Sequence, residues 1–377
     1  MIVGRLRLGF IPLADCAPLA AAEALGLFRA EGLDVELVRE ASWATIRDKV
    51  QARLLDGAHM LGPMALASSL GIGGERSDIL APMALNLNGS AVSISRDLVL
   101  EMRAADPEAM ARQPRTARAL KRVISRRRAD GAAPLTFAVV FAFSMHAYEL
   151  RYWLADAGID PDRDLRLVVS PPARMAERLR SGEIDGFCVG APWNAAAEAD
   201  GSGEIVVRAS DIWPRGPDKV LGVARAFAEN DPETLQALLR ALIRAAHWAD
   251  QPENRPALAE LLARPEYVDQ PAPLLARALV DSSDAIIFHA GAANFPWLSH
   301  AAWFLAQMRR WGQAGPELDI AAAAAAVYRP DLYRKAAEAV GVSAPPVDSK
   351  VEDGFDPADI DGYLSSFAIR REPVRAG

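Results

Sequence analysis

The N-terminal part of the chain alternates between strand-like and helix-like patterns of apolar residues. Residues 6–11 are mostly apolar and predict a strand, and residues 33–38 alternate apolar with polar positions as a second strand does. Between them, residues 17–29 carry apolar side chains at helical spacing and are followed by Gly32, a residue type that commonly ends helices. This order predicts a β-α-β unit and therefore an α/β fold.

The same alternation returns in the middle of the chain. Residues 137–143 form a continuous apolar run, as expected of a strand that is buried on both faces of a parallel sheet. Ser144 is a good helix cap and precedes a helical pattern, as Ser42 does earlier in the chain before Ile46, Val50 and Leu54. Residues 165–169 predict another strand, and residues 175–180 a short helix that leads into an apolar run at 184–189.

Two segments share one pattern, namely residues 57–65 and residues 182–193. Each has a glycine at a helix end, a short apolar strand, a second glycine (Gly62 or Gly190) and a nearby proline. Matching strand-to-turn units predict two similar α/β halves that face one cleft. The alternative is that the two segments are similar by chance, because the chain is rich in glycine and proline.

The C-terminal part is mainly helical. Asp231 followed by Pro232 is typical of a helix start, and the long helix that follows runs through Trp248. The helical pattern continues to about Tyr333. The tail after Ala344 is rich in proline and aspartate, and we expect it to pack as an extended strap over the surface.

The turn at Gly190 is a candidate anion site. A strand that ends in glycine, with Pro192 in the first helical turn, presents backbone N–H groups at a helix start, and such groups attract anions. Similar strand-turn-helix junctions precede Trp43 and His146, and ligands of open α/β sheets bind outside the carboxyl ends of strands. We therefore expect the three turns to meet at one site for a small anion, although a plain chain reversal gives the same pattern at Gly190.

Each candidate side chain also has a purely structural interpretation. Trp43 is either an aromatic wall of the site or a residue that packs its own half. His146 either donates an N–H group to an oxyanion or is a satisfied structural histidine, and Lys219 either neutralises an anion or is solvated in a turn. The basic run at residues 121–128 is most simply a solvated helix face, with partner binding as the alternative.

Composition excludes several classes of protein. The chain has 377 residues, of which 51% are hydrophobic, and a formal net charge of −7, which argues against direct nucleic-acid binding through a basic surface. Cys16 and Cys188 lie far apart, so neither a disulfide framework nor a zinc site is expected, and we interpret Cys188 as a core residue. The sequence contains no nucleophile elbow, P-loop or dinucleotide fingerprint, so we expect neither an enzyme nor a cofactor.

The first residues do not predict an export signal. The apolar stretch that follows the basic residues near the start is interrupted by Pro12, Asp15 and Pro18. No apolar run in the sequence reaches the roughly 18 to 20 residues of a membrane span. A cytoplasmic location is therefore expected.

Several motifs in a fixed order resemble the nitrate- and bicarbonate-binding family of ABC-transporter solute receptors. They extend from about residue 5 to about residue 310 and read GFIPLADCAPLAAAEALGLFRAEGLDVELVREASWATIRDKV, HMLGPMALA, RYWLADAGIDP, EIDGFCVGAPWN and PDKVLGV. The resemblance implies a type II periplasmic-binding-protein fold, in which two α/β lobes joined by two crossings hold the ligand in the cleft between them. On that basis we expect residues 1–94 with 220–377 to form one lobe, including the helical extension and the strap, and residues 95–219 to form the other.

The resemblance also implies a set of anion contacts. In the nitrate binders of this family, a tryptophan, a glutamine, a histidine, a glycine amide and a lysine hold the anion. By motif, these positions correspond to Trp43, His146, Gly190 and Lys219, and the glutamine position falls near LNLNGSA, where this chain offers Asn88 or Ser90. A changed fifth contact would alter the preference between nitrate and nitrite.

The absence of an export signal favours the cytoplasmic branch of the family, which resembles nitrate/nitrite sensors of the NasS type. That resemblance implies that the anion shifts an open-to-closed equilibrium and thereby releases an RNA-binding, response-regulator-like antiterminator protein. The alternatives are the solute-binding component of a nitrate-type ABC transporter and a thiamin-pyrimidine-synthase-like enzyme, whose cysteine-rich segment is missing here. Replacement of Lys219 by alanine is expected to abolish anion binding and leave the fold intact.

Overall fold

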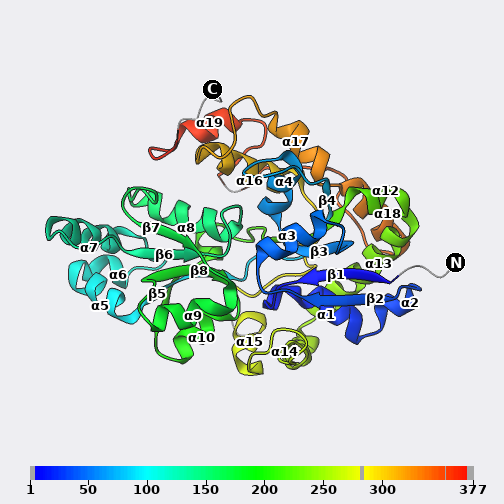
Figure 1. Ribbon diagram of the computed structural model, residues 1–377, viewed down its shortest axis with the longest axis horizontal. Coiled ribbons are helices and arrows are strands. Elements are labelled where there is room, and N and C mark those ends of the chain that lie inside the picture. The colour runs from blue at the N-terminus through cyan, green and yellow to red at the C-terminus, as the bar shows by residue number, and fades with distance from the viewer. Residues whose placement is uncertain (1–4, 281–283, 353, 372–377) are drawn as a thin grey trace.

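The chain folds into two lobes, each built around one five-stranded sheet. The computed structural model describes residues 5–280, 284–352 and 354–371. Helices pack around both sheets, and the lobes lie side by side (Figure 1). The predicted pair of α/β lobes is therefore confirmed.

The sheet of lobe 1 has the strand order β2-β1-β3-β10-β4. Its strands are β1 (Leu6–Phe10), β2 (Val35–Arg39), β3 (Gly57–Leu61), β4 (Ile79–Ala84) and β10 (Lys219–Ala224). β1 pairs in parallel with β2 and β3, whereas β10 runs antiparallel between β3 and β4. The strand that enters last along the chain thus lies inside the sheet rather than at its edge.

The sheet of lobe 2 repeats this topology in the order β7-β6-β8-β5-β9. Its strands are β5 (Ser90–Ser95), β6 (Thr136–Val139), β7 (Arg166–Val169), β8 (Gly186–Gly190) and β9 (Gly203–Arg208). β3 and β8 hold equivalent places in the two sheets, which accounts for the matching sequence patterns that end at Gly62 and Gly190.

The first crossing between the lobes comes earlier than expected. The expected boundary at residue 94 falls inside β5, which pairs with β8 and β9 of lobe 2. The chain therefore enters lobe 2 before Ser90, because the partners of a strand, and not its own pattern, decide which sheet it joins. The return crossing ends at Lys219, the first residue of β10 in lobe 1.

The helices are divided between the two lobes. In lobe 1 they are α1 (Ala17–Ala24), α2 (Leu27–Ala30), α3 (Trp43–Gln51), α4 (Gly62–Leu70), α12 (Arg225–Asn230), α13 (Pro232–Asp250), α14 (Arg255–Leu262), α15 (Ala272–Leu279), α16 (Leu298–Arg310), α17 (Ile320–Val327), α18 (Pro330–Ala339) and α19 (Ile360–Ser365). In lobe 2 they are α5 (Arg96–Ala105), α6 (Pro107–Ala111), α7 (Arg118–Ala129), α8 (Met145–Asp156), α9 (Met175–Arg180), α10 (Trp193–Ala199) and α11 (Ala209–Ile212). Among the described helices, none has the length and apolar character needed to cross a membrane.

Local signals explain where most elements begin and end. The side chains of Ser42 and Ser144 accept hydrogen bonds from backbone N–H groups at the starts of α3 and α8, at 3.2 and 3.0 Å, so both predicted caps are confirmed. The single helix expected over residues 17–29 is instead α1 and α2, because Gly26 adopts a left-handed conformation with φ 69°. The strand expected over 137–143 ends at Val139, four residues early.

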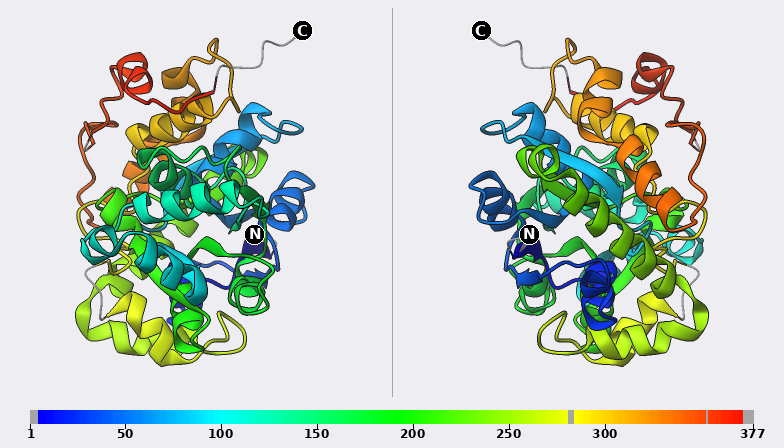
Figure 2. Two further views of the ribbon diagram at one scale, coloured as in Figure 1. Left: turned by 90° about the vertical axis from the view of Figure 1, so that its left-hand side faces the viewer. Right: turned by 90° about the vertical axis from the view of Figure 1, so that its right-hand side faces the viewer.

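The C-terminal tail forms the expected strap, but it contains α19 and joins the two lobes. It runs along one edge of the molecule (Figure 2). The Tyr363 hydroxyl accepts a hydrogen bond from Nε1 of Trp303 in α16 at 2.9 Å. Further along, the Arg371 guanidinium bonds to Asp160 at 3.0 Å and Asp162 at 2.9 Å, both in lobe 2. The strap therefore ties the end of lobe 1 to the loop that follows α8.

Candidate functional site

Four of the predicted anion contacts converge between the lobes. Trp43 begins α3 and Lys219 begins β10 in lobe 1, while His146 lies in the first turn of α8 and Gly190 ends β8 in lobe 2. Nζ of Lys219 lies 5.7 Å from the centre of the Trp43 ring. A Cβ atom placed on Gly190 would lie 3.5 Å from Nε2 of His146. All four are buried, so the lobes are closed around this point.

Lys219 is not the solvated turn residue that was one interpretation of the sequence. Its exposed fraction is 1%, and Nζ donates to Oδ2 of Asp15 at 2.7 Å and to Oδ2 of Asp218. Asp15 lies in the short 3-10 helix Ala14–Cys16 after β1. Its other oxygen faces Nε2 of His59 at 2.8 Å. The lysine is thus the centre of a buried charge cluster and not a loosely held surface charge.

The cluster shifts the titration of its members in opposite directions. Burial alone would raise the pKa of Asp15, but the positive charge of Lys219 and the contact with His59 hold it well below its usual range. Burial raises the pKa of Asp218 to about 6, because Lys219 offsets only part of the desolvation. Burial would lower the pKa of Lys219, but Asp15 and Asp218 together raise it. Lys219 and Asp15 are therefore charged at neutral pH.

Two buried side chains at this cluster have ring nitrogens without a hydrogen-bond partner among the described residues. They are Trp43, through Nε1, and His146, whose Nε2 atom lies 3.6 Å from Oδ2 of Asp218. Burial and the nearby Lys219 charge keep the pKa of His146 well below its usual range, so the ring is neutral and carries one N–H. Buried donors without an acceptor are rare because they cost free energy. A ligand that only accepts hydrogen bonds would satisfy both.

The two candidates for the fifth contact differ in their surroundings. Ser90 is the register partner of Gly190 and so borders the site, but its hydroxyl donates to Oε2 of Glu149 at 2.5 Å. Asn88 is buried in the crossing between the lobes, and its backbone N–H donates to the carbonyl of Gly216. The Oδ1 atom of Asn88 has no partner among the described residues. The Ser90 hydroxyl is thus engaged by Glu149, and the described contacts do not identify which of the two side chains would be the fifth anion contact.

Sequence reasoning missed four members of the site, namely Asp15, His59, Asp218 and Glu149. Three of them had a local signal. Asp15 is an acidic residue in an otherwise apolar stretch, Asp218 directly precedes Lys219, and Glu149 follows His146 by one helical turn on α8. A charged residue in such a place needs a buried partner or a ligand.

The raised pKa of Glu149 predicts that the free energy of unfolding depends on pH. Burial raises its pKa to about 8 even though Ser90 donates to it. A carboxyl group whose pKa is raised by folding makes the protein less stable as the pH rises from its unfolded value toward its folded value. We expect Glu149→Gln to leave the free energy of unfolding nearly unchanged at pH 5 and to increase it at pH 9 by on the order of a few kcal/mol.

Urea unfolding of both proteins at pH 5, 7 and 9 measures this difference. The exposed Glu233 gives the matched control variant, Glu233→Gln, for which no comparable increase is expected. A difference between Glu149→Gln and the wild type that does not grow with pH would contradict the assignment.

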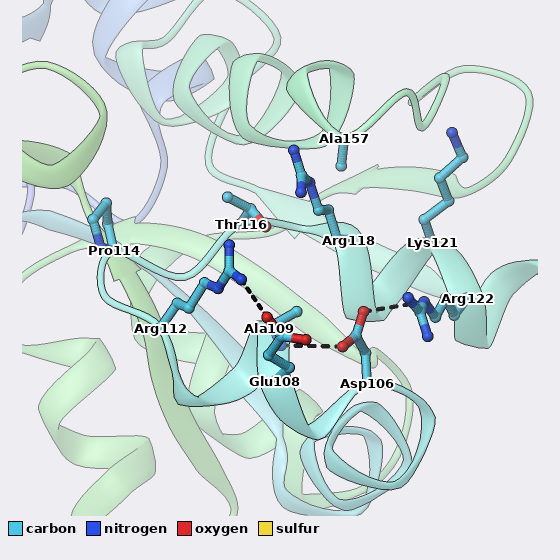
Figure 3. Close-up of a pocket in the computed structure, with 10 residues that line it drawn as sticks. All are labelled: Asp106, Glu108, Ala109, Arg112, Pro114, Thr116, Arg118, Lys121, Arg122 and Ala157. Carbon is cyan, nitrogen blue, oxygen red and sulfur yellow. Dashed lines mark hydrogen bonds and ion pairs between the residues drawn. The ribbon is translucent and has the colours of Figure 1, made fainter.

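A separate hollow lies on lobe 2, away from the lobe interface. Its volume is about 500 Å³, and Figure 3 shows basic side chains of α7 and the preceding loop around it. Arg122 pairs with Asp106 at 3.0 Å. Lys121, Arg122, Arg126 and Arg128 lie on the exposed face of α7, whereas Leu120, Val123 and Ile124 are buried beneath them. This arrangement agrees with the solvated-face interpretation of the basic run, and no predicted anion contact lines the hollow.

The sequence pattern of the NMT1-like family matches residues 3–263, which is more than half of the chain. The chain belongs to the NMT1-like family. The nitrate/nitrite binding protein NrtA of Synechococcus elongatus is 34% identical over 97% of this chain and 86% of its own length. The crystal structure of the periplasmic nitrate-binding protein NrtA from Synechocystis has a TM-score of 0.89 and 30% identity, and covers 97% of this chain and 99% of that one.

These relatives confirm the resemblance to anion receptors and the periplasmic-binding-protein fold. The two NrtA proteins, which are aligned over most of their length, are named for binding and not for an enzymatic activity. The nitrate import ATP-binding protein NrtC of Synechocystis is 35% identical over 97% of this chain but only 56% of its own length. The chain thus spans little more than half of that relative.

Proposed function

We propose that this protein is a receptor for nitrate or nitrite that serves as the solute-binding component of an ABC transporter. The observation that carries the proposal is the buried group of donors at the lobe interface. The Lys219 ammonium lies 5.7 Å from the centre of the Trp43 ring, and the ring N–H groups of Trp43 and His146 make no hydrogen bond with the described residues. The nitrate-binding relatives, which share the whole fold, support the choice of anion.

The chemistry of nitrate fits these donors. Nitrate is a planar anion with three acceptor oxygens and no proton to give, so every contact must come from a donor on the protein. The starts of α3 and α8 both lie at the site, and the positive end of a helix dipole favours an anion there. Trp43, His146 and Lys219 are buried from solvent, which strengthens each of these interactions relative to bulk water.

Entry of the anion requires the lobes to separate. In the closed state, Tyr148 of α8 donates to Oε1 of Gln313 in lobe 1 at 2.8 Å, and Nε1 of Trp193 donates to the carbonyl of Pro12 at 3.2 Å. These bonds cross the cleft and must break in an open state. Binding then corresponds to a shift of the open-to-closed equilibrium toward the closed state.

Isothermal titration of the purified protein with nitrate and with nitrite tests the proposal. We expect saturable binding of one anion per chain for at least one of them, and no comparable binding of perchlorate, which is larger and tetrahedral. Absence of heat for both anions across pH 5 to 8 would rule the proposal out.

Gly190 offers a specific test of the site. A Cβ atom there would lie 3.3 Å from Oδ2 of Asp15 and 3.5 Å from Nε2 of His146, which fills the space in front of Lys219. We expect Gly190→Ala to weaken nitrate binding at least about tenfold, because the methyl group prevents the close approach of an anion. The control is Gly74→Ala, where an added Cβ meets nothing within 4 Å. Equal nitrate affinities of the two variants would show that Gly190 does not contact the anion.

A regulatory role is the second candidate. Its support is the similarity to NrtC, in which a region like this chain occurs within a protein named for ATP binding rather than for solute binding alone. In that role the protein would reside in the cytoplasm, and nitrate or nitrite would release an RNA-binding antiterminator by favouring the closed state. None of the relatives described above is named for antitermination. Co-purification of a partner that nitrate displaces would support this role, and a complex that persists at saturating nitrate would exclude the mechanism.

A further inference from the structure

We propose that nitrate binds at this site together with one proton, and that Asp218 carries this proton. The inference rests on the proposed function, since it concerns how the same site accommodates the anion. Asp218 would then be a determinant of affinity and specificity and not only a partner of Lys219.

The charged groups around Lys219 oppose the entry of an anion. The titratable groups that face Asp218 are Lys219 on β10, Asp15 on the 3-10 helix, His59 on β3, His146 and Glu149 on α8, Cys188 on β8 and Tyr328 after α17. Within this group, only Lys219 carries a fixed positive charge. With both aspartates ionised, Lys219 already faces two negative charges before any anion arrives.

An anion that contacts Lys219 meets both carboxylates at short range. Nζ of Lys219 is bonded to Asp15 and to Asp218 at once, and their side chains are only about 3% exposed. Water therefore does not screen the repulsion between the entering anion and these carboxylates. Neutralisation of one carboxylate removes the repulsion and frees a donor position on Lys219 for the anion.

Asp218 is better suited to take the proton than Asp15. Asp15 is held ionised from two sides, by Lys219 at 2.7 Å and by His59 at 2.8 Å. Asp218 is hydrogen-bonded to Lys219, its Oδ2 atom lies 3.6 Å from Nε2 of the neutral His146, and its Oδ1 atom has no hydrogen-bond partner among the described residues. The pKa of Asp218 is already raised to about 6 by burial, in agreement with this assignment.

Protonation also reverses the hydrogen-bonding role of Asp218. A neutral carboxyl group can donate its O–H to an oxygen of nitrate, whereas a carboxylate can only accept. At higher pH the site therefore favours an oxyanion that carries its own hydroxyl, and at lower pH it favours an anion such as nitrate that has only acceptors.

Calorimetry with nitrate tests the inference directly. Titrations at pH 8 in HEPES and in Tris, whose ionisation enthalpies differ, give the number of protons taken up with each anion. We expect close to one proton, and a Kd that rises about tenfold for each pH unit above the pKa of the free site. For Asp218→Asn, which keeps the shape and supplies a permanent donor, we expect no uptake, a Kd independent of pH and tighter binding than wild type at pH 8.

The outcomes are distinguishable. Nitrate binding by the wild type without proton uptake, and with constant Kd from pH 6.5 to 8.5, overturns the inference and leaves the proposed function standing. Uptake that persists in Asp218→Asn, or that is lost in Glu149→Gln instead, overturns the assignment to Asp218. No binding by the wild type or by Asp218→Asn at any pH overturns the proposed function and the inference with it. If Asp218→Asn does not fold, the wild-type uptake and pH profile still decide whether a proton is coupled.

Discussion

Replacement of Lys219 by methionine is expected to lower the free energy of unfolding by roughly 3–5 kcal/mol and to abolish nitrate binding. Methionine keeps much of the side-chain volume but leaves Asp15 and Asp218 buried without the ammonium that now bonds to both. The sequence alone predicted an intact fold for Lys219→Ala, on the view that a charge at the edge of a lobe is dispensable. Lys219 is buried, so the premise of that expectation, a dispensable charge at the edge of a lobe, is wrong.

Urea unfolding and nitrate titration measure the two effects. The loss of stability should become smaller as the pH falls, because removal of Lys219, which lowers the pKa of Asp218, lets this carboxylate take up a proton in the variant more readily and one uncompensated charge then disappears. Lys335→Met is the matched control, since Lys335 is exposed and faces the exposed Glu233 at 3.5 Å. Equal stabilities of Lys219→Met and Lys335→Met would show that the buried cluster does not depend on the lysine.

Replacement of Tyr363 by alanine in the strap is expected to lower the free energy of unfolding by roughly 2–3 kcal/mol. The Tyr363 ring packs edge-on against Phe355 and Phe367, each with ring centres 4.9 Å apart. Its hydroxyl accepts hydrogen bonds from Trp303 and Gln307, both at 2.9 Å. Alanine removes the ring contacts and leaves both donors without this acceptor.

Tyr363→Phe separates the two contributions. It keeps the ring and removes only the acceptor, so about 1–2 kcal/mol of the loss should remain. Since the strap continues to Arg371 and its contacts with lobe 2, we also expect faster release of nitrate from Tyr363→Ala in stopped-flow measurements. Identical unfolding free energies for the alanine and phenylalanine variants would show that the ring contributes nothing.

Local patterns predicted those parts of the fold that local interactions decide. The strand at β1, the caps at Ser42 and Ser144 and the start of α13 at Asp231 all depend on residues within one helical turn or on strand alternation. The cap of α13 follows the same rule, since Asp231 accepts from the N–H of Thr234 at 3.2 Å. Such short-range interactions depend only on residues that are close in the sequence, so the sequence alone can predict them.

Features that depend on distant partners were predicted less well. The pattern of residues 91–95 shows a strand but not the sheet that the strand joins, because β8 and β9, which pair with it, lie far along the chain. The length of β6 is likewise limited by its partners β7 and β8, which pair with it only as far as Val139. Pairing across a sheet is a property of the folded chain.

The sequence by itself determined the α/β class, the two similar halves and, through its ordered motifs, the residues Trp43, His146, Gly190 and Lys219 that the structure brings together. Only the tertiary structure decided the charge of that site. Asp15 and Lys219 are separated by 204 positions in the sequence and by 2.7 Å in space. The free energy of a buried charge depends on its distance from other charges and from water, and neither distance exists until the two lobes have folded and closed.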